Sequence, residues 1–202
     1  MRKVTIVPTG TANTASVIAA LTRLGASVEE ASSAADVDSA PGVVLPGVGA
    51  FGAAMARIDS LGLARALRER IEAGWPTLAV CVGMQLLGRD SEESPEARGL
   101  QVVDERVGRF GDGVNVPQMG WNTVEADPGS RFVETGWAYF ANSYRIDRVP
   151  SGWVATHSEH GGRFVAALEK DDVLACQFHP ELSGEWGASL LDRWLGRVKA
   201  AA

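Results

Sequence analysis

The stretch "TLAVCVGMQLLG" at residues 77–88 places Cys81 between an apolar run and a segment with helical character. A sharp strand-to-helix turn would project this side chain out of a sheet, and it requires small neighbours because the flanking backbones come close together. Ala79 and Gly83 meet that requirement. The unpaired N–H groups of a helix N-terminus would also favour the nucleophilic thiolate. The alternative is an inert, buried cysteine that packs as a small hydrophobic residue.

A nucleophilic thiol needs a base, and His179 is the best candidate among three histidines. It follows the apolar run "VLACQF" and precedes Pro180 and Glu181. In an extended "HPE" segment the His and Glu side chains lie on the same side, so the carboxylate can orient the imidazole. The sequence therefore offers a Cys81, His179 and Glu181 triad, although "HPE" alone is also typical of a strand end followed by a capping acid.

The other two histidines, His157 and His160, stand in the polar segment "THSEHGG", which predicts a surface loop. Their spacing could suggest a pair of metal ligands, but no acidic or cysteine cluster supports such a site. We expect neither a metal nor a cofactor.

A third feature is the glycine-rich stretch "LPGVGAFG" at residues 45–52. Gly47 and Gly49 permit a sharp turn that exposes backbone N–H groups to a ligand, as an oxyanion hole requires. An ordinary strand-to-helix turn is the alternative. All three features follow predicted strands, which is where open α/β sheets collect their binding residues.

The first half of the chain alternates apolar strand patterns with helical periodicity. Strands are predicted at 3–7, 43–46 and 77–80, and helices at 17–24 and 61–74. Short apolar strands joined by helices predict an α/β fold with a mostly parallel sheet that is covered on both faces.

The second half is richer in aromatic and β-branched residues. The runs "NVPQMGWNTV", "WAYFANSYRI", "GWVATH", "FVAALE" and "VLACQF" predict a mostly antiparallel section of sheet. The final stretch "GEWGASLLDRWLGRVKA" predicts an amphipathic helix, and the acidic run 89–99 a solvated loop.

Bulk properties narrow the class of protein. With 202 residues, 46% hydrophobic and 22% charged, the chain suits one globular domain over 1–202. A net charge of −6 argues against partners such as nucleic acid or an anionic membrane. The longest charge-free window, 39–56, contains two prolines, and the first apolar run stops at Pro8, so neither a membrane span nor a secretory signal is expected. Two cysteines without metal or disulfide spacing predict free thiols and a cytoplasmic location.

Taken together, the motifs resemble those of the class I glutamine amidotransferases, and most closely those of the glutaminase subunits of imidazole glycerol phosphate synthases. The resemblance rests on "LPGVGAFGAAM", "VCVGMQLLG", "VPQMGWN", "YFANSY" and "QFHPELSGEWGASLL", which spread over most of the chain. It implies a flavodoxin-like α/β fold with a central, mostly parallel sheet flanked by helices.

The resemblance also implies roles. Cys81 would attack the side-chain amide carbon of glutamine and form a glutamyl thioester, His179 would transfer protons, and Glu181 would hold His179 in place. The expected oxyanion hole consists of backbone N–H groups of Val82 and of the turn Gly47, Val48 and Gly49. The expected glutamine pocket is lined by Gly49, Gln85, Ser143 and Tyr144.

Three positions depart from the family pattern. Ala79 stands where the turn before the cysteine usually opens with glycine, and Asn142 stands where histidine is common. The N-terminal segment "PTGTANTASV" keeps only Asn13 of its usual motif. The triad itself is intact.

Nothing in the chain resembles a phosphate-binding loop, so the ammonia it releases needs an acceptor elsewhere. The resemblance implies a (β/α)8 cyclase subunit as partner in a heterodimer, which would use ammonia to make imidazole glycerol phosphate and an aminoimidazole carboxamide ribonucleotide. Met119 and Trp121 in "VPQMGWN" are candidate docking residues, or alternatively core residues. A glutaminase of another pathway and a catalytically silent scaffold domain remain competing hypotheses.

Overall fold

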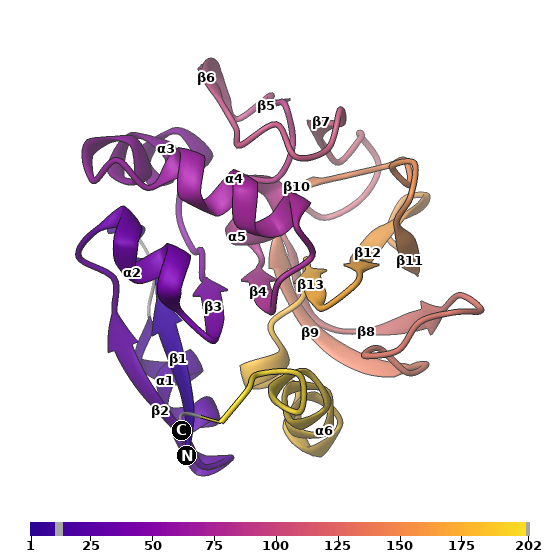
Figure 1. The fold of residues 1–202 in the computed structure, drawn as a ribbon. Coiled ribbons are helices and arrows are strands. Elements are labelled where there is room, and N and C mark those ends of the chain that lie inside the picture. The colour runs from indigo at the N-terminus through magenta and orange to yellow at the C-terminus, as the bar shows by residue number, and fades with distance from the viewer. Residues whose placement is uncertain (11–13, 201–202) are drawn as a thin grey trace.

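A nine-stranded sheet crosses the molecule in the order β2-β1-β3-β4-β13-β12-β11-β8-β9 (Figure 1). The computed structural model describes residues 1–10 and 14–200, so the expectation for Asn13 lies outside the described residues. Five neighbouring strands are parallel: β2 (Ala26–Glu30), β1 (Arg2–Ile6), β3 (Gly42–Leu45), β4 (Thr77–Val80) and β13 (Val173–Cys176). β3, β4 and β13 are buried along their whole length, which explains their continuous apolar sequences.

The other four strands extend this sheet in antiparallel fashion. They are β12 (Arg163–Lys170), β11 (Val154–Glu159), β8 (Gln118–Ala126) and β9 (Gly136–Asn142). The predicted α/β class and the predicted antiparallel second half are thus both confirmed. Phe140, Phe164 and Phe178 pack edge to face beneath this section and close its core.

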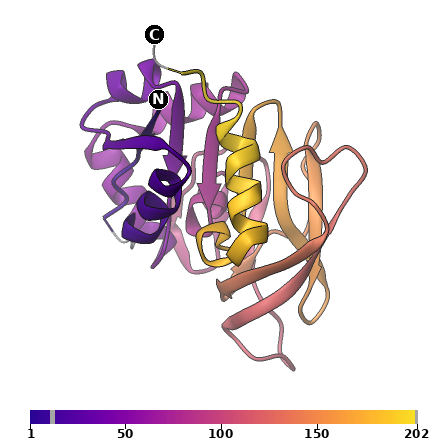
Figure 2. The ribbon, with the colours of Figure 1, turned by 90° about the horizontal axis from the view of Figure 1, so that it is seen from below.

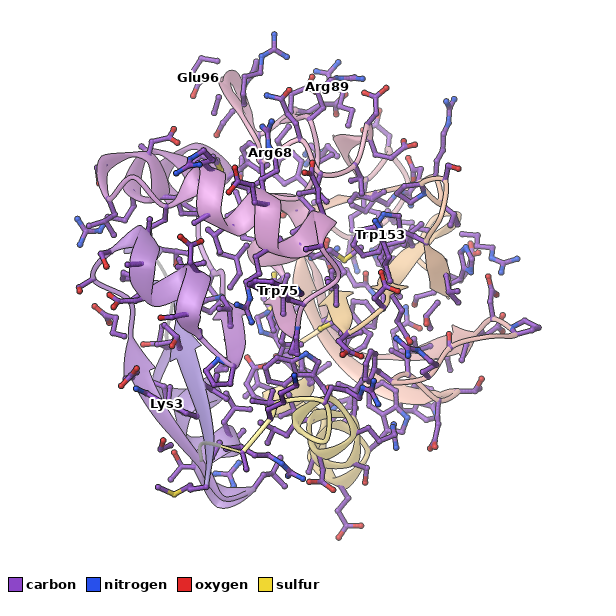
Figure 3. All side chains as sticks on the ribbon, viewed as in Figure 1. Lys3, Arg68, Trp75, Arg89, Glu96 and Trp153 are labelled. Atoms are coloured by element: carbon purple, nitrogen blue, oxygen red, sulfur yellow. The ribbon has the colours of Figure 1, made fainter. Side chains whose placement is uncertain are left out.

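A second, four-stranded sheet has the order β10-β7-β5-β6. Its strands are β10 (Tyr144–Arg145), β7 (Arg106–Arg109), β5 (Asp90–Ser91) and β6 (Ser94–Arg98). The prediction of a solvated loop over 89–99 is therefore wrong. Asp90 lies within 3.3 Å of the guanidinium nitrogens of Arg89, Arg98 and Arg106, so charge pairing rather than apolar periodicity organises this hairpin. Figure 3 shows Arg89 and Glu96 at the outer edge of the molecule.

Helices cover both faces of the large sheet. α2 (Ala34–Ser39), α3 (Phe51–Ser60) and α4 (Ala64–Glu72) lie on one face, and α1 (Thr14–Arg23) and α6 (Gly184–Leu195) on the other (Figures 1 and 2). The short α5 (Val82–Gln85) and the 3-10 turn η1 (Pro180–Leu182) follow β4 and β13. Among residues 1–10 and 14–200, no helix has the length and apolar composition needed to cross a membrane.

Differences from the predicted elements have local causes. Gly74 has a φ of 71° and ends α4 where a glycine stop was expected. The strand β2 was missed because its sequence "ASVEE" is half exposed at the sheet edge and carries no apolar run.

The order of the parallel strands determines where the candidate residues meet. β3, β4 and β13 are adjacent and parallel, with Val44 opposite Leu78 and Leu78 opposite Leu174. Their carboxyl ends therefore lie at one edge of the sheet. The segments that follow them, 46–49, 81–85 and 177–181, are brought side by side there.

Gly83 is the tightest point of this arrangement. A Cβ added to Gly83 would collide with the carbonyl oxygen of Leu45, whereas one added to Gly111 would meet nothing within 4 Å. We expect Gly83→Ala to lower the free energy of unfolding by about 2 kcal/mol or more, because this contact is with backbone and cannot yield by a rotamer change. Urea unfolding of both variants provides the measurement. Gly111→Ala is the control and stays within about 0.5 kcal/mol of the parent.

Candidate active site

Cys81 occupies the predicted strand-to-helix turn between β4 and α5. Its backbone has φ 53° and ψ −112°, a conformation that a residue with a Cβ rarely adopts. Two hydrogen bonds hold it there: the Cys81 N–H donates to Cys176 O at 2.7 Å, and the Gln85 N–H donates to Cys81 O at 3.2 Å. The thiol is thereby directed out of the sheet and towards the strand-end loops.

The glycine-rich turn after β3 presses against the start of α5. A Cβ on Gly47 would lie 2.5 Å from the Gly83 nitrogen, so glycine is required at this contact. The Val82 N–H donates to Gly47 O at 3.3 Å. The N–H group expected to bind an oxyanion is therefore engaged with a carbonyl in this structure.

His179 faces Cys81 from the segment after β13. The His179 Nδ1 lies 2.8 Å from Glu181 Oε1, and both side chains are only 5% exposed. The expected extended "HPE" segment is not what brings them together. Residues Pro180–Leu182 form a 3-10 turn, and this turn carries the carboxylate back to the imidazole.

The electrostatic setting of His179 is unusual. Burial lowers the pKa of the imidazole, but hydrogen bonds to Cys81 and Glu181 and the negative charges of these groups raise it, with a net increase to about 10. At neutral pH the side chain of His179 is therefore a protonated imidazolium that lies between the sulfur and the carboxylate.

A cavity of about 230 Å³ opens beside the sulfur, a volume suited to a small ligand. The structure brings most of the predicted pocket and oxyanion residues to its wall: Val48, Gly49, Cys81, Val82, Gln85, Ser143, Tyr144 and His179. Gly47 and Glu181 are not part of the wall. Gly47 supports the turn beneath Val82, and Glu181 contacts the far side of His179.

Three wall residues were not predicted to line the pocket: Glu93, Ala141 and Asn142. Glu93 comes from the hairpin at residues 90–98, where the sequence predicts a solvated loop, and its Oε2 accepts the Phe51 N–H at 2.7 Å at the start of α3. Asn142 departs from the family pattern, and its Nδ2 donates to Tyr144 O at 3.0 Å. A capping carboxylate has no apolar pattern of its own, so no local signal distinguished Glu93 from its acidic neighbours.

The remaining histidines lie away from this cavity. His157 is on β11 rather than in a loop, and its side chain is 12% exposed and 3.3 Å from Asp127. His160 lies just after β11, where its ring packs edge to face on Phe110. In the described part of the chain, no group of three or more His, Cys, Asp or Glu residues could hold a metal ion.

Comparisons with known proteins identify the family of the chain. The family model described as glutamine amidotransferase class-I matches residues 6–196. The imidazole glycerol phosphate synthase subunit HisH of Moorella thermoacetica is 40% identical over 205 residues, covering 100% of this chain and 98% of the relative. The HisH subunit of Mycobacterium leprae is 41% identical over 204 residues, covering 98% of each chain.

Two further comparisons extend the range. The chloroplastic imidazole glycerol phosphate synthase hisHF of Arabidopsis thaliana is 37% identical over 201 residues, covering 95% of this chain and 34% of that protein. A crystal structure of glutamine amidotransferase superposes with a TM-score of 0.75 at 21% identity, covering 95% of this chain and 96% of the other. The motifs, the fold and these relatives lead to one conclusion: the chain belongs to the class I glutamine amidotransferases, among the HisH subunits of imidazole glycerol phosphate synthase.

Proposed function

We propose that the chain hydrolyses glutamine to glutamate and ammonia at Cys81 and passes the ammonia to a cyclase subunit of imidazole glycerol phosphate synthase, in histidine biosynthesis. The observation that carries the proposal is the buried Cys81, His179 and Glu181 constellation beside a cavity at the end of three parallel strands. The HisH relatives, 40 and 41% identical, favour this pathway over other glutaminases.

The reaction follows from the positions of the three groups. The proton shared by the Cys81 and His179 pair resides on the imidazole, so the sulfur attacks the amide carbon of glutamine without a further proton transfer. The imidazolium then delivers that proton to the departing ammonia, which leaves a glutamyl thioester. Neutral His179 next removes a proton from water, and the hydroxide cleaves the thioester to glutamate and restores the sulfur. Glu181 supports the imidazole in both protonation states by fixing its orientation.

The wall of the cavity suits glutamine. Glu93 is the sole acidic side chain among the wall residues, and its carboxylate is a suitable counter-charge for the α-ammonium group of an amino acid. The side chains of Gln85, Ser143 and Tyr144 supply neutral polar groups, and we assign them to the amide and carboxylate ends of the substrate.

The oxyanion hole requires a rearrangement. Because the Val82 N–H donates to Gly47 O, it must exchange this carbonyl for the developing oxyanion before it can stabilise negative charge. Rotation of the Gly47–Val48 peptide would remove the carbonyl and turn the Val48 N–H towards the site. Gly47 has the conformational freedom to take up the change in ψ that such a rotation requires.

The ammonia acceptor is expected at an exposed apolar surface next to the site. We call it the β8–β9 face, made of Met119, Trp121, Trp137, Tyr139 and Leu182. Four of these side chains are between 45 and 64% exposed, so the alternative that Met119 and Trp121 are core residues is contradicted. Clustered exposed tryptophans are typical of protein interfaces.

The β8–β9 face is continuous with the catalytic cavity. Ala141 pairs with Met119 and points to the same side of the sheet as Tyr139, and it also lines the cavity, with its carbonyl oxygen 4.0 Å from the Cys81 sulfur. A partner seated on this face would therefore cover the point where ammonia leaves. We infer that the partner is a (β/α)8 cyclase in a heterodimer. The free thiols Cys81 and Cys176 suit the reducing cytoplasm, where we place the complex.

The function is tested by replacing the nucleophile. We expect Cys81→Ala to abolish glutamine-dependent formation of imidazole glycerol phosphate by the assembled complex, and to leave ammonium-dependent formation within about twofold of the parent. Product release is measured with each nitrogen source, and Cys176→Ala, which removes the thiol outside the cavity, is the control. If the parent complex formed no glutamate and Cys81→Ala changed nothing, the silent scaffold hypothesis would hold; if the variant still used glutamine, Cys81 would not be the nucleophile.

The raised pKa of His179 predicts a pH dependence of stability. A folded-state pKa of about 10 against 6.5 for the free side chain stabilises the fold fully below pH 6.5, and this contribution is lost as the pH rises towards 10. Glu181→Gln removes one cause of the increase. We expect the difference in unfolding free energy between parent and variant to be largest near pH 6 and to shrink towards pH 10, as measured by urea unfolding.

The exposed Glu134, which is paired with Arg193, offers a control. For Glu134→Gln we expect a difference in unfolding free energy that does not change over this pH range. For Glu181→Gln, a difference that grows with pH would contradict the assignment.

The docking surface predicts a selective loss of affinity. Trp121→Ala should weaken binding of the cyclase subunit by about 2 kcal/mol or more, roughly 30-fold. Tryptophan is enriched among the few interface residues that contribute most of the binding free energy. Isothermal titration gives the dissociation constant. Trp75, 51% exposed before β4 and labelled in Figure 3, provides the matched control Trp75→Ala. Equal losses for the two variants would place the partner elsewhere.

A further inference from the structure

The mechanism above leaves one fully buried polar side chain at the nucleophile without a role. Gln177 is the first residue after β13, and its side chain has no exposure to solvent. Its Nε2 lies 3.6 Å from the Cys81 sulfur, within hydrogen-bond range for this element, and its Oε1 accepts from Gln85 Nε2 at 2.9 Å. Gln177 thus joins the nucleophile to a residue of the glutamine pocket.

The direction of these hydrogen bonds is determined by a backbone carbonyl. Gln85 Nε2 also donates to Tyr144 O at 3.1 Å, and a carbonyl oxygen can only accept. The amino group of Gln85 must therefore face this side, and its second hydrogen meets the oxygen of Gln177. If the oxygen and nitrogen of the Gln177 amide were exchanged, its amino group would face the amino group of Gln85, and two donors would meet without an acceptor. Its amino group consequently faces the sulfur.

The backbone around Gln177 is held independently of its side chain. The Gln177 N–H donates to Ala166 O at 2.8 Å, and the Cys81 turn is anchored by the bond from its own N–H to Cys176 O. The side-chain amide is therefore not needed to form either segment. An N–H donor directed at a sulfur stabilises negative charge on it and restricts the direction of attack.

We propose that Gln177 is a positioning residue for the nucleophile: its amide aligns the Cys81 sulfur and connects it to Gln85 in the glutamine pocket. This inference rests on the proposed role of Cys81. A substrate that contacts Gln85 would then reinforce the alignment of the sulfur through two hydrogen bonds. The expected signature is an effect on turnover with little effect on substrate binding, because Tyr144 O holds Gln85 without Gln177.

Two variants separate the two ends of the connection. Gln177→Met removes both hydrogen bonds with little change in volume. Gln177→Glu keeps an acceptor for Gln85 but presents oxygen instead of N–H to the sulfur. We expect kcat for glutamine hydrolysis in the assembled complex to fall about 10-fold or more in both variants, with KM changed less than about threefold. The rate of Cys81 alkylation by iodoacetamide, followed by mass spectrometry, should fall in both and furthest in Gln177→Glu.

The controls distinguish this inference from the proposed function. Gln118 is also buried, but its side-chain amide has no hydrogen-bond partner, so Gln118→Met should leave the alkylation rate of Cys81 unchanged. If Cys81→Ser abolishes hydrolysis while both Gln177 variants keep parental kcat and alkylation rates, the positioning role is wrong and the nucleophile stands. A rise in KM alone would also overturn the positioning role. If Cys81→Ser still hydrolyses glutamine, the proposed active site itself fails.

Discussion

The backbone of Cys81 adopts a positive φ of 53°, and the rest of the site depends on the contacts that hold it there. Such a conformation costs about 1–3 kcal/mol and persists only where the surroundings determine it. Here β13 supplies a carbonyl to the Cys81 N–H, and Gly83 lets α5 approach the carbonyl of Leu45. Strand pairing and close backbone packing therefore hold Cys81 in the conformation that directs its sulfur towards the cavity. A long helix after Cys81 is not required for this.

At the same edge of the sheet, the charged groups of the site lie close together and are largely shielded from water. Burial alone would keep His179 neutral, but the sulfur and the Glu181 carboxylate outweigh this effect and raise its pKa to about 10. A proton held between two acceptors can be delivered to a departing amine without contact with bulk water. The 3-10 turn at Pro180–Leu182 makes this possible, since it folds the carboxylate back onto Nδ1.

The position of the cavity connects chemistry to assembly. β9 contributes Ala141 to the cavity wall, while the side chains of its neighbours on the same side of the sheet form the β8–β9 face. His179 is tied to this strand as well, because its N–H donates to Tyr139 O at 2.8 Å. A partner that presses on β8 and β9 would thus act on β9, which contacts both the backbone of His179 and the sulfur of Cys81. This continuity gives a structural basis for coupling between a docked synthase subunit and glutamine hydrolysis.

The sequence by itself determined the features that depend on local pattern. Apolar runs defined the buried parallel strands, small residues around Cys81 indicated a sharp turn, and the two-residue spacing of His179 and Glu181 indicated a pair. Tertiary structure alone decided which polar residues reach the cavity. Glu93 lies there because a charged hairpin folds over α3, and Gln177 meets Cys81 because β13 pairs with β4. Whether a polar side chain is solvated or buried depends on the element packed opposite it. That element comes from a distant part of the sequence, so the pattern of neighbouring residues does not predict it.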